Sequence, residues 1–300
     1  MSIQSLINGP FGVGAIITIG KIIPPAIGYP LAEKIALRLN KNKDSDMMRA
    51  ARANQWVISG KTLTSSELDQ RMRQTLIDAS HWLYDFYHNM HNYKNIIERV
   101  ALTKRLIEIL DERKHADEGT ILVVPHLSNF DFAGRAMALH GYQVQVLSYP
   151  QPHGGYRWQN KLRKDIGIDI TPISTETLRS AKARLKKGGM IVTGLDRPLQ
   201  KSNYHPKFFG IPAALPVSYV RLALQTHSAV MVVACVGLPQ RNYQVICSEP
   251  VTMQPFPDPV VEIETNAEKL LSSAEDIIRA HPTQWAMFYP VWPSILEEIP

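Results

Sequence analysis

The chain has 300 residues, of which 45% are hydrophobic and 20% are charged. These proportions are typical of a globular protein with a sizeable core and argue against a disordered or fibrous chain. The net charge of +6 favours anionic partners, namely nucleic acid, a membrane surface or a phosphorylated cofactor, although a mild positive charge also serves solubility alone. Nucleic-acid binding needs a dense basic stripe with exposed aromatic residues, and the sequence contains no such stripe.

Two cysteines, Cys235 and Cys247, lie in apolar runs and show no CxxC or metal-ligand spacing. A disulfide framework needs more cysteines than these. We therefore expect both to be reduced core residues in a protein that faces the cytosol. The histidine spacings do not predict a metal site either, because such sites need more ligands at tighter spacing.

Residues 10–32 are largely apolar, but Lys21 and three prolines interrupt them. A membrane-spanning helix needs roughly 18 or more uninterrupted apolar residues, and a signal peptide needs a basic start and a cleavage site. The segment therefore predicts an element that enters one leaflet of a membrane. A core-packed helix with a proline-rich turn is the alternative.

Residues 31–113 are predicted to be helical. Helical spacing of apolar residues starts at Ser65 and continues through Tyr87, and residues 97–110 continue in the same way. Residues 1–113 are therefore interpreted as a helical N-terminal region.

From Gly119 onward the pattern alternates between strands and helices. Strands are predicted at residues 120–125, 143–148, 169–173, 190–194, 229–236 and 243–251, and helices at 130–140, 157–165, 175–187, 216–225 and 263–280. This alternation predicts an α/β fold over residues 114–300, with a mostly parallel central sheet flanked by helices. Active sites in such sheets lie beyond the carboxyl ends of the strands, where His126 and Asp196 are expected.

The strand predicted at residues 120–125 is followed by His126, and Asp131 comes five positions later. Ser128 or Asn129 is placed to cap the next helix, so that Asp131 falls in its first turn and faces the strand end. A carboxylate there accepts the proton on one imidazole nitrogen and makes the other nitrogen a better base. The pair therefore predicts a general base and its orienting carboxylate. A capping aspartate beside a solvent-facing histidine is the alternative.

The run from His126 to Gly134 resembles the H-x-G-N-W-[ED]-x-x-G signature of the bacterial lysophospholipid acyltransferase-like group. That group includes the lipid A late acyltransferases (lauroyl and myristoyl) and the phosphatidylinositol mannoside acyltransferases. Further blocks resemble the group in the same order along the chain, at residues 178–197, 207–213, 228–233 and 266–290. The resemblance covers about residues 50 to 293 and implies a glycerol-phosphate acyltransferase-like fold.

The sequence departs from the group's pattern at three positions. Ser128 replaces the usual glycine, Phe130 the usual tryptophan, and Ala234 the usual proline of a strand. We expect the first two departures to alter how closely the backbone approaches the substrate. A long N-terminal spanning helix is not evident in the sequence, which favours peripheral or monotopic attachment at the cytoplasmic face of the inner membrane.

The resemblance implies that an acyl chain moves directly from acyl-CoA or acyl carrier protein to a hydroxyl of a lipid or glycolipid, without a covalent acyl-enzyme. His126 is then the base, Asp131 orients it, and a backbone amide or a cation near the strand end holds the oxyanion. No cofactor is expected beyond the acyl thioester as co-substrate. Substrate or donor contacts are expected from Ser128, Asn129, Arg157, Arg163, Asp196, Arg197, Phe208, Phe209 and Gly210.

Plainer alternatives stand beside these assignments. Asp196 is equally well explained by a structural salt bridge, the arginines by a solvated helix face, and Phe208 and Phe209 by core packing. At the level of function, a catalytically inactive lipid-binding protein on the same scaffold is the alternative from another class. An N-acyltransferase and an acyl-thioester hydrolase are alternatives within the enzyme class.

Overall fold

A computed structural model of the chain describes residues 20, 22–89, 91–149, 154–165 and 168–300, except for the side chains of residues 154–158 and 162. The predicted membrane segment 10–32 therefore lies in part outside the described residues. Among the helices described, none combines the length and the apolar composition that crossing a lipid bilayer requires.

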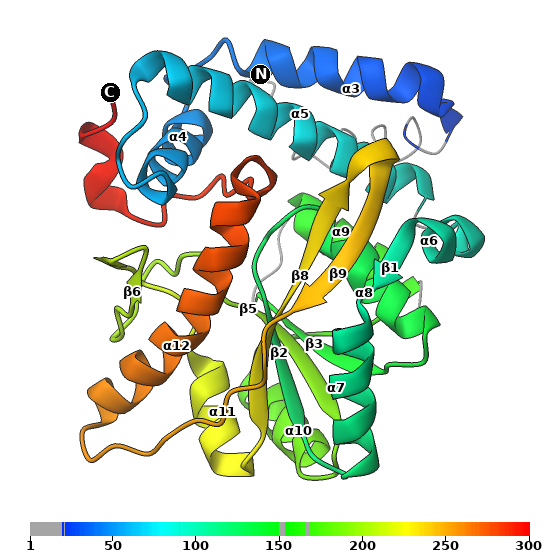
Figure 1. The fold of residues 1–300 in the computed structure, drawn as a ribbon, viewed down its shortest axis with the longest axis vertical. Helices are drawn as coiled ribbons and strands as arrows, with labels where there is room; N and C mark the ends of the chain where they lie inside the picture. The colour runs from blue at the N-terminus through cyan, green and yellow to red at the C-terminus, as the bar shows by residue number, and fades with distance from the viewer. Residues whose placement is uncertain (1–19, 21, 90, 150–153, 166–167) are drawn as a thin grey trace.

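The centre of the molecule is a sheet whose seven described strands follow the order β1-β9-β8-β2-β5-β3-β4 (Figure 1). All neighbours are parallel except β8 and β9, which form an antiparallel hairpin. The mostly parallel α/β fold is thus confirmed. The strand bounds are β1 Val100–Leu102, β2 Thr120–Val124, β3 Val144–Ser148, β4 Asp169–Pro172, β5 Met190–Gly194, β8 Ala229–Leu238 and β9 Asn242–Cys247.

Each central strand is buried on both faces, because helices cover the sheet on each side. Ile121 and Val123 of β2 pack into one core cluster together with α10 (Thr175–Leu185), α11 (Ser218–Thr226) and α12 (Pro259–Ala280). Leu122 faces the opposite way and packs with α7 (Lys104–His115) and α8 (Phe130–Leu139). The continuous apolar run of β2 follows from this two-sided burial.

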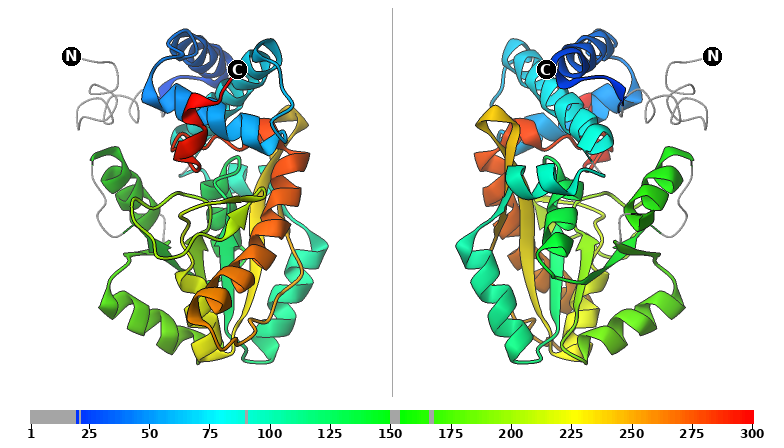
Figure 2. Two further views of the ribbon diagram at one scale, coloured as in Figure 1. Left: turned by 90° about the vertical axis from the view of Figure 1, so that its left-hand side faces the viewer. Right: turned by 90° about the vertical axis from the view of Figure 1, so that its right-hand side faces the viewer.

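Three N-terminal helices lie beyond the carboxyl ends of the parallel strands (Figure 2). They are α3 Pro25–Leu39, α4 Asp46–Ile58 and α5 Ser65–Asn89. The C-terminal segment lies beside α4, where Asn54 hydrogen-bonds to the backbone of Met287, Tyr289 and Val291. These helices therefore cover the edge of the sheet where a site is expected.

The continuous helix predicted at residues 97–110 is wrong. Helix α6 (Tyr93–Arg99) ends before β1, and α7 begins after Thr103, whose side chain caps it. Val100 to Leu102 pair in parallel with β9. Hydrogen bonding to this strand therefore makes three residues extended that the apolar spacing had predicted to be helical. The short β6–β7 hairpin (Lys207–Phe208 and Ile211–Pro212) was also not predicted. Among the described residues, one more α-helix is α9 (Gly154–Asp165).

Helices α3 and α5 pack closely at Gly28, where an added Cβ would overlap the ring of Tyr84. Gly134, in the middle of α8, has room: its Cβ would meet only Ile168, at 3.9 Å. We predict that Gly28→Ala destabilises the protein by about 2 kcal/mol through overpacking. The matched change Gly134→Ala should stabilise it by about 0.5 kcal/mol, because alanine favours a helix over glycine.

Thermal unfolding of both variants measures the two signs, and hydrogen exchange in α3 locates the first effect. Equal unfolding temperatures for Gly28→Ala and the wild type would contradict the close α3–α5 packing.

Candidate active site

The ends of β2 and β5 bring His126 and Asp196 together. The two strands are parallel and in register, with Val124 opposite Gly194. His126 lies two residues beyond Val124, and Asp196 lies two residues beyond Gly194, so the two side chains lie side by side at the strand ends. The Nδ1 atom of His126 lies 2.6 Å from Oδ1 of Asp196, and its backbone N–H donates to Oδ2 at 2.8 Å. Strand register, rather than helix capping, thus provides the carboxylate for this histidine.

Asp196 is fully buried and accepts a third hydrogen bond, from the indole Nε1 of Trp285 at 2.8 Å. Trp285 is itself fully buried, and the backbone carbonyl of its neighbour Gln284 accepts the backbone N–H of Ser128 at 2.8 Å. A buried carboxylate is stable only when such donors replace its hydration. The C-terminal block therefore fixes both Asp196 and the loop that follows His126.

The predicted His126–Asp131 hydrogen bond is not present. Asp131 instead forms a two-point ion pair with Arg163 of α9, with N–O distances of 2.6 and 2.9 Å. It does lie in the first turn of α8, as expected, and lines the same cavity as His126. From there its carboxylate meets the guanidinium of α9, while the imidazole turns toward β5.

The imidazole of His126 is about one-third exposed and has an accessible second nitrogen. With Nδ1 bonded to Asp196, Nε2 has no hydrogen-bond partner among the residues that the structure describes. Gly194 gives the ring space, since a Cβ there would lie 3.3 Å from its Cε1 atom. Phe130 holds the ring from another side, edge to face, with centroids 5.2 Å apart. The arrangement leaves one nitrogen free to accept a proton.

The loop from His126 to α8 has a special backbone at Ser128, whose φ is +48°. Glycine adopts this left-handed region most easily, which accounts for the glycine usual at this position in the group that the chain resembles. The expected cap is confirmed at Asn129, whose side chain accepts the backbone N–H of Phe132. Both Ser128 and Asn129 are buried.

An apolar cavity of about 220 Å³ opens beside His126 and continues along the sheet under α8 and α9. His126, Asp131 and Arg163 are among its polar lining residues, and apolar side chains line the remainder, including Leu122, Ala133, Met137, Val146, Ile168, Ile170, Val192 and Val233. Cys235 also lines it; burial raises the pKa of its thiol to about 12, so it is a neutral thiol rather than a nucleophile.

Arg197 lines the cavity next to Asp196 and lies among aromatic rings. Its guanidinium is 4.3 Å from the ring centre of Tyr289 and 5.3 Å from that of Tyr149. Both tyrosines are exposed by at least two-fifths of their surface. Stacked arginines of this kind are well suited to bind phosphate.

The structure does not bring all the predicted contact residues to His126. Phe208 is fully buried in the core, with its ring stacked on Trp292 at 5.6 Å. Phe209 and Gly210 form the turn of the β6–β7 hairpin, with positive φ at both residues, and neither lines the cavity. The side chain of Arg157 lies outside the described part of the chain.

Trp285 is the contributor that was not predicted as a site residue. Its position after a proline at the end of a long helix suggested only a closing structural block. The signal that was available is chemical: a buried indole needs an acceptor for its N–H, and Asp196 is one of few carboxylates at a strand end.

Similar proteins are found among the phosphatidylinositol mannoside acyltransferases of mycobacteria. The proteins of that name from Mycobacterium tuberculosis, strains ATCC 25618 / H37Rv and CDC 1551 / Oshkosh, are each 24% identical over 213 residues, which is 69% of this chain and 65% of the relative. The one from Mycolicibacterium smegmatis is 24% identical over 191 residues, or 61% of this chain and 60% of the relative. The matched stretch thus spans just under two thirds of these relatives.

The profile of a family described as bacterial lipid A biosynthesis acyltransferase matches residues 9–294. This range contains both strand ends of the site, the cavity and Trp285. The match confirms the group that the blocks around His126, Asp196 and Trp285 resemble. The chain belongs to the bacterial lipid A biosynthesis acyltransferase family.

Proposed function

We propose that this protein is an O-acyltransferase that moves a fatty acyl chain from a thioester donor to a hydroxyl of a lipid or glycolipid. The observation that carries the proposal is the placement of a free imidazole nitrogen, backed by a buried carboxylate, at an apolar cavity. A base at the entrance of an apolar chamber is what acyl transfer to an alcohol requires. The family and the printed names of the relatives support the same chemistry.

In the proposed step, Nε2 of His126 removes the proton of the acceptor hydroxyl, and the oxygen attacks the thioester carbonyl. The tetrahedral intermediate collapses with release of the thiolate, which takes the proton from the imidazolium. Asp196 holds the tautomer in which Nε2 is the base, and it stabilises the imidazolium that forms in between. We thus assign to Asp196 the orienting role expected of Asp131. The amino end of α8, positive by its dipole, lies at this loop and favours the oxyanion.

The apolar cavity is the proposed site of the acyl chain. Its lining comes from the sheet face under α8 and from α8 itself, so that an alkyl chain entering beside His126 replaces water along its full length. Each buried methylene contributes about 0.8 kcal/mol to binding, which is enough to select a long chain over a short one. Asp131 and Arg163 close the polar end of this cavity.

Arg197 is the proposed contact for a phosphate of the donor or of the acceptor. It lies one residue beyond Asp196 and lines the cavity. Its guanidinium lies over the rings of the two exposed tyrosines, Tyr149 and Tyr289. The names of the relatives refer to an acceptor with a phosphodiester and sugars, and a cation at this position suits such a head group.

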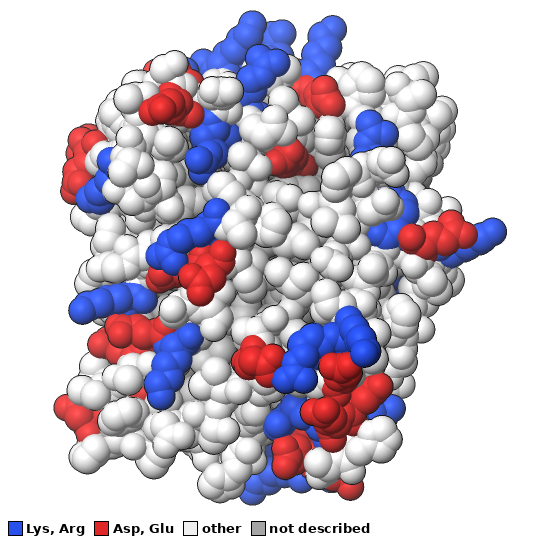
Figure 3. Space-filling model, in the orientation of Figure 1, with Lys and Arg blue, Asp and Glu red and all other residues white. Residues whose placement is uncertain are grey.

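We also propose that α3 attaches the protein to the membrane surface, as a peripheral or monotopic protein on the cytoplasmic face. Ile27, Leu31 and Ile35 are exposed and follow one another every fourth residue, which gives an apolar stripe along the helix. Basic side chains project at this end of the molecule in Figure 3; Lys34 and Arg38 are exposed on the helix itself. Apolar and basic groups together match a bilayer with anionic lipids.

A hydrolase of acyl thioesters would need a water site in place of an acceptor site, and an inactive lipid binder would not need the His126–Asp196 pair. The His126–Asp196 pair at the cavity therefore argues against the inactive binder, and the dependence of turnover on an acceptor separates a transferase from a hydrolase.

The decisive experiment adds labelled acyl-CoA and candidate lysolipids or glycolipids in anionic vesicles to the purified protein. We expect acceptor-dependent transfer in the vesicle-bound fraction, and we expect His126→Ala to lower turnover by about 10³-fold in a protein that still folds, with a lower unfolding temperature because Asp196 loses one of its donors. Thioester hydrolysis that does not depend on the acceptor would overturn the transferase assignment. Transfer by protein that fails to float with vesicles would overturn the membrane attachment.

The variants Asp196→Asn and Asp131→Asn separate the two carboxylates near the histidine. In Asp196→Asn the new side chain is an amide of the same size, without the charge that stabilises the imidazolium; we expect kcat to fall by about 10³-fold with KM little changed. Asp131→Asn breaks an ion pair at the cavity mouth, and we expect mainly a raised KM for the donor. Steady-state kinetics with the donor varied measures both effects, and the reverse order of the two kcat losses would refute the assignment to Asp196.

Ala133→Leu tests the cavity, because Ala133 of α8 lines it. The larger side chain shortens the chamber, so we expect the preferred acyl chain to become shorter by about two methylenes, at 0.8 kcal/mol each. Ala138→Leu, on the same helix but away from the cavity, is the matched control and should leave the preference unchanged. Competition between acyl-CoA esters of different length gives the readout, and an unaltered preference in Ala133→Leu would exclude this cavity as the acyl site.

A further inference from the structure

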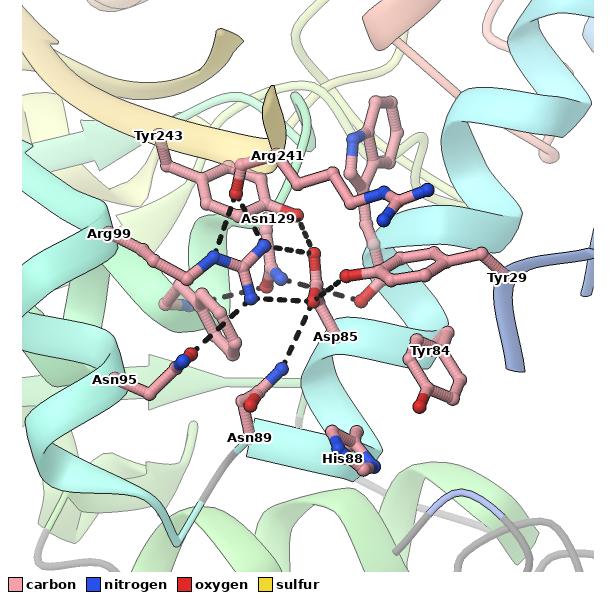
Figure 4. A network of polar contacts seen from close by, with 12 residues as sticks. Tyr29, Tyr84, Asp85, His88, Asn89, Asn95, Arg99, Asn129, Arg241 and Tyr243 are labelled. Atoms are coloured by element: carbon pink, nitrogen blue, oxygen red, sulfur yellow. Dashed lines mark hydrogen bonds and ion pairs between the residues drawn. The ribbon is translucent and has the colours of Figure 1, made fainter. Parts of the chain in front are cut away.

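A second buried carboxylate, Asp85 of α5, lies at the centre of a polar network away from His126 (Figure 4). It is fully buried. Its Oδ1 atom accepts from Tyr29 at 2.6 Å, from Arg99 at 2.8 Å and from Asn89 at 3.1 Å. Its Oδ2 atom accepts from Arg99 at 2.9 Å and from the hydroxyl of Tyr243. Five hydrogen bonds therefore converge on one carboxylate.

These partners come from separate elements: Tyr29 from α3, Arg99 from α6 and Tyr243 from β9. Burial and the nearby carboxylate raise the pKa of both tyrosines, so their hydroxyls remain protonated and act as donors. Asp85 thus ties the N-terminal helices to the edge of the sheet. Removing one partner of such a cluster leaves a buried group uncompensated.

The same cluster holds a strained turn between β8 and β9. Gln240 and Arg241 have φ values of 58° and 63°, a left-handed backbone that glycine and asparagine adopt more easily, in the three-residue loop between the paired residues Leu238 and Asn242. The carbonyl of Arg241 accepts from Nε of Arg99 at 2.9 Å, and its guanidinium lies 3.6 Å from the ring centre of Tyr29. Strain of this kind persists only where the surroundings hold it.

The network reaches the active-site loop through Asn129. The Nδ2 atom of Asn129 donates to the backbone carbonyl of Trp82 at 3.4 Å, and Trp82 lies three residues before Asp85 on the same helix, α5. Its Oδ1 caps α8. Every polar atom of this side chain is thus used, between His126 and Asp131 in the chain.

We propose that Asp85 and Tyr243 are positioning residues for the catalytic loop, acting through Asn129. The inference rests on the proposed function, since it concerns the base of that reaction. The loop needs such support because Ser128 holds a left-handed backbone that the residue does not favour by itself. With α5 held by the bond from Tyr243 to Asp85, and Asn129 held by the carbonyl of Trp82 on that helix, the loop keeps the backbone N–H of His126 on Asp196 and its Nε2 atom toward the cavity.

The test removes a single hydroxyl. Tyr243→Phe keeps the buried ring against Phe132, 5.5 Å away, but loses the hydrogen bond to Asp85 on α5, the helix whose Trp82 carbonyl holds Asn129. Tyr142→Phe is the matched control, because the Tyr142 hydroxyl also donates to a carboxylate, that of Asp111 at 2.9 Å, and Tyr142 neither lines the cavity nor touches the loop.

We expect kcat of Tyr243→Phe to fall about tenfold, as small misplacements of reacting groups do, with KM of the donor within about twofold of the wild type. Tyr142→Phe should keep the wild-type kcat. All rates are measured well below the unfolding temperature of each variant, so that a loss of stability alone does not change them. A wild-type kcat in Tyr243→Phe overturns the proposal.

Asn129→Ser provides a second route if Tyr243→Phe does not fold. Serine keeps a capping oxygen for α8, but it is too short to reach the backbone carbonyl of Trp82. Asn129→Ser should lower kcat by a similar factor. In a folded double variant the two losses should not add, because both weaken the same connection between α5 and the loop. Additive losses contradict the route through Asn129.

One readout does not need the reaction. In ¹⁵N-histidine spectra, the proton between His126 and Asp196 should shift or broaden in Tyr243→Phe and remain as in the wild type in Tyr142→Phe. If the wild type transfers no acyl chain, the proposed function fails, while this spectrum still decides the positioning role. An unaltered signal in Tyr243→Phe overturns that role.

Discussion

The carboxylate of Asp196 is the constraint on which the rest of the site depends. It is fully buried, so the protein must supply donors for its charge, and it does so from three directions. Two donors belong to His126 after β2, and the third is the indole of Trp285 near the C-terminus. One anion thereby fixes a strand end, the imidazole of His126 and a segment 89 residues later in the chain.

The same physical rule organises the surroundings. Asp131 and Asp85 are also withdrawn from water, and each is matched by an arginine with two-point geometry, Arg163 and Arg99 respectively. The first ion pair joins α8 to α9, and the second joins α5 to α6. Each pair therefore fixes the position of two helices relative to each other. Polar contacts at the carboxyl ends of the parallel strands therefore determine how the surrounding helices are oriented. The two apolar clusters on the faces of the sheet supply most of the stability.

How far the sequence predicts the fold depends on how local the determining forces are. The strand of residues 190–194 and the helix at Phe130 were correct, since apolar runs and a capping asparagine act within a few residues. The strand at Val100 was missed, because only the free edge of β9 makes those residues extended. The local sequence of a segment does not show which distant segment lies next to it in the fold.

The site follows the same division. The histidine at a strand end was predicted, and so was the capped helix after it. Its partner was assigned to Asp131, because spacing along the chain is visible in a sequence and register between strands is not. Once Val124 is known to lie opposite Gly194, the choice of Asp196 follows by counting two residues along each strand. Phe208 was placed near the substrate by similarity, while its volume and ring contacts belong to the core.

The register of β2 and β5 has a further consequence. His126 and Asp196 follow two adjacent strands, whereas β3, α9 and β4, which lie in the chain between these strands, contribute a part of the cavity wall beside β2, β5 and α8. Because β5 pairs with β2 directly, the intervening stretch can change in length or shape while the spacing of the two strand ends stays constant. Under the proposed function, a substitution in β3, α9 or β4 can therefore change the shape of the cavity, and with it the preferred acyl chain, without moving His126 or Asp196.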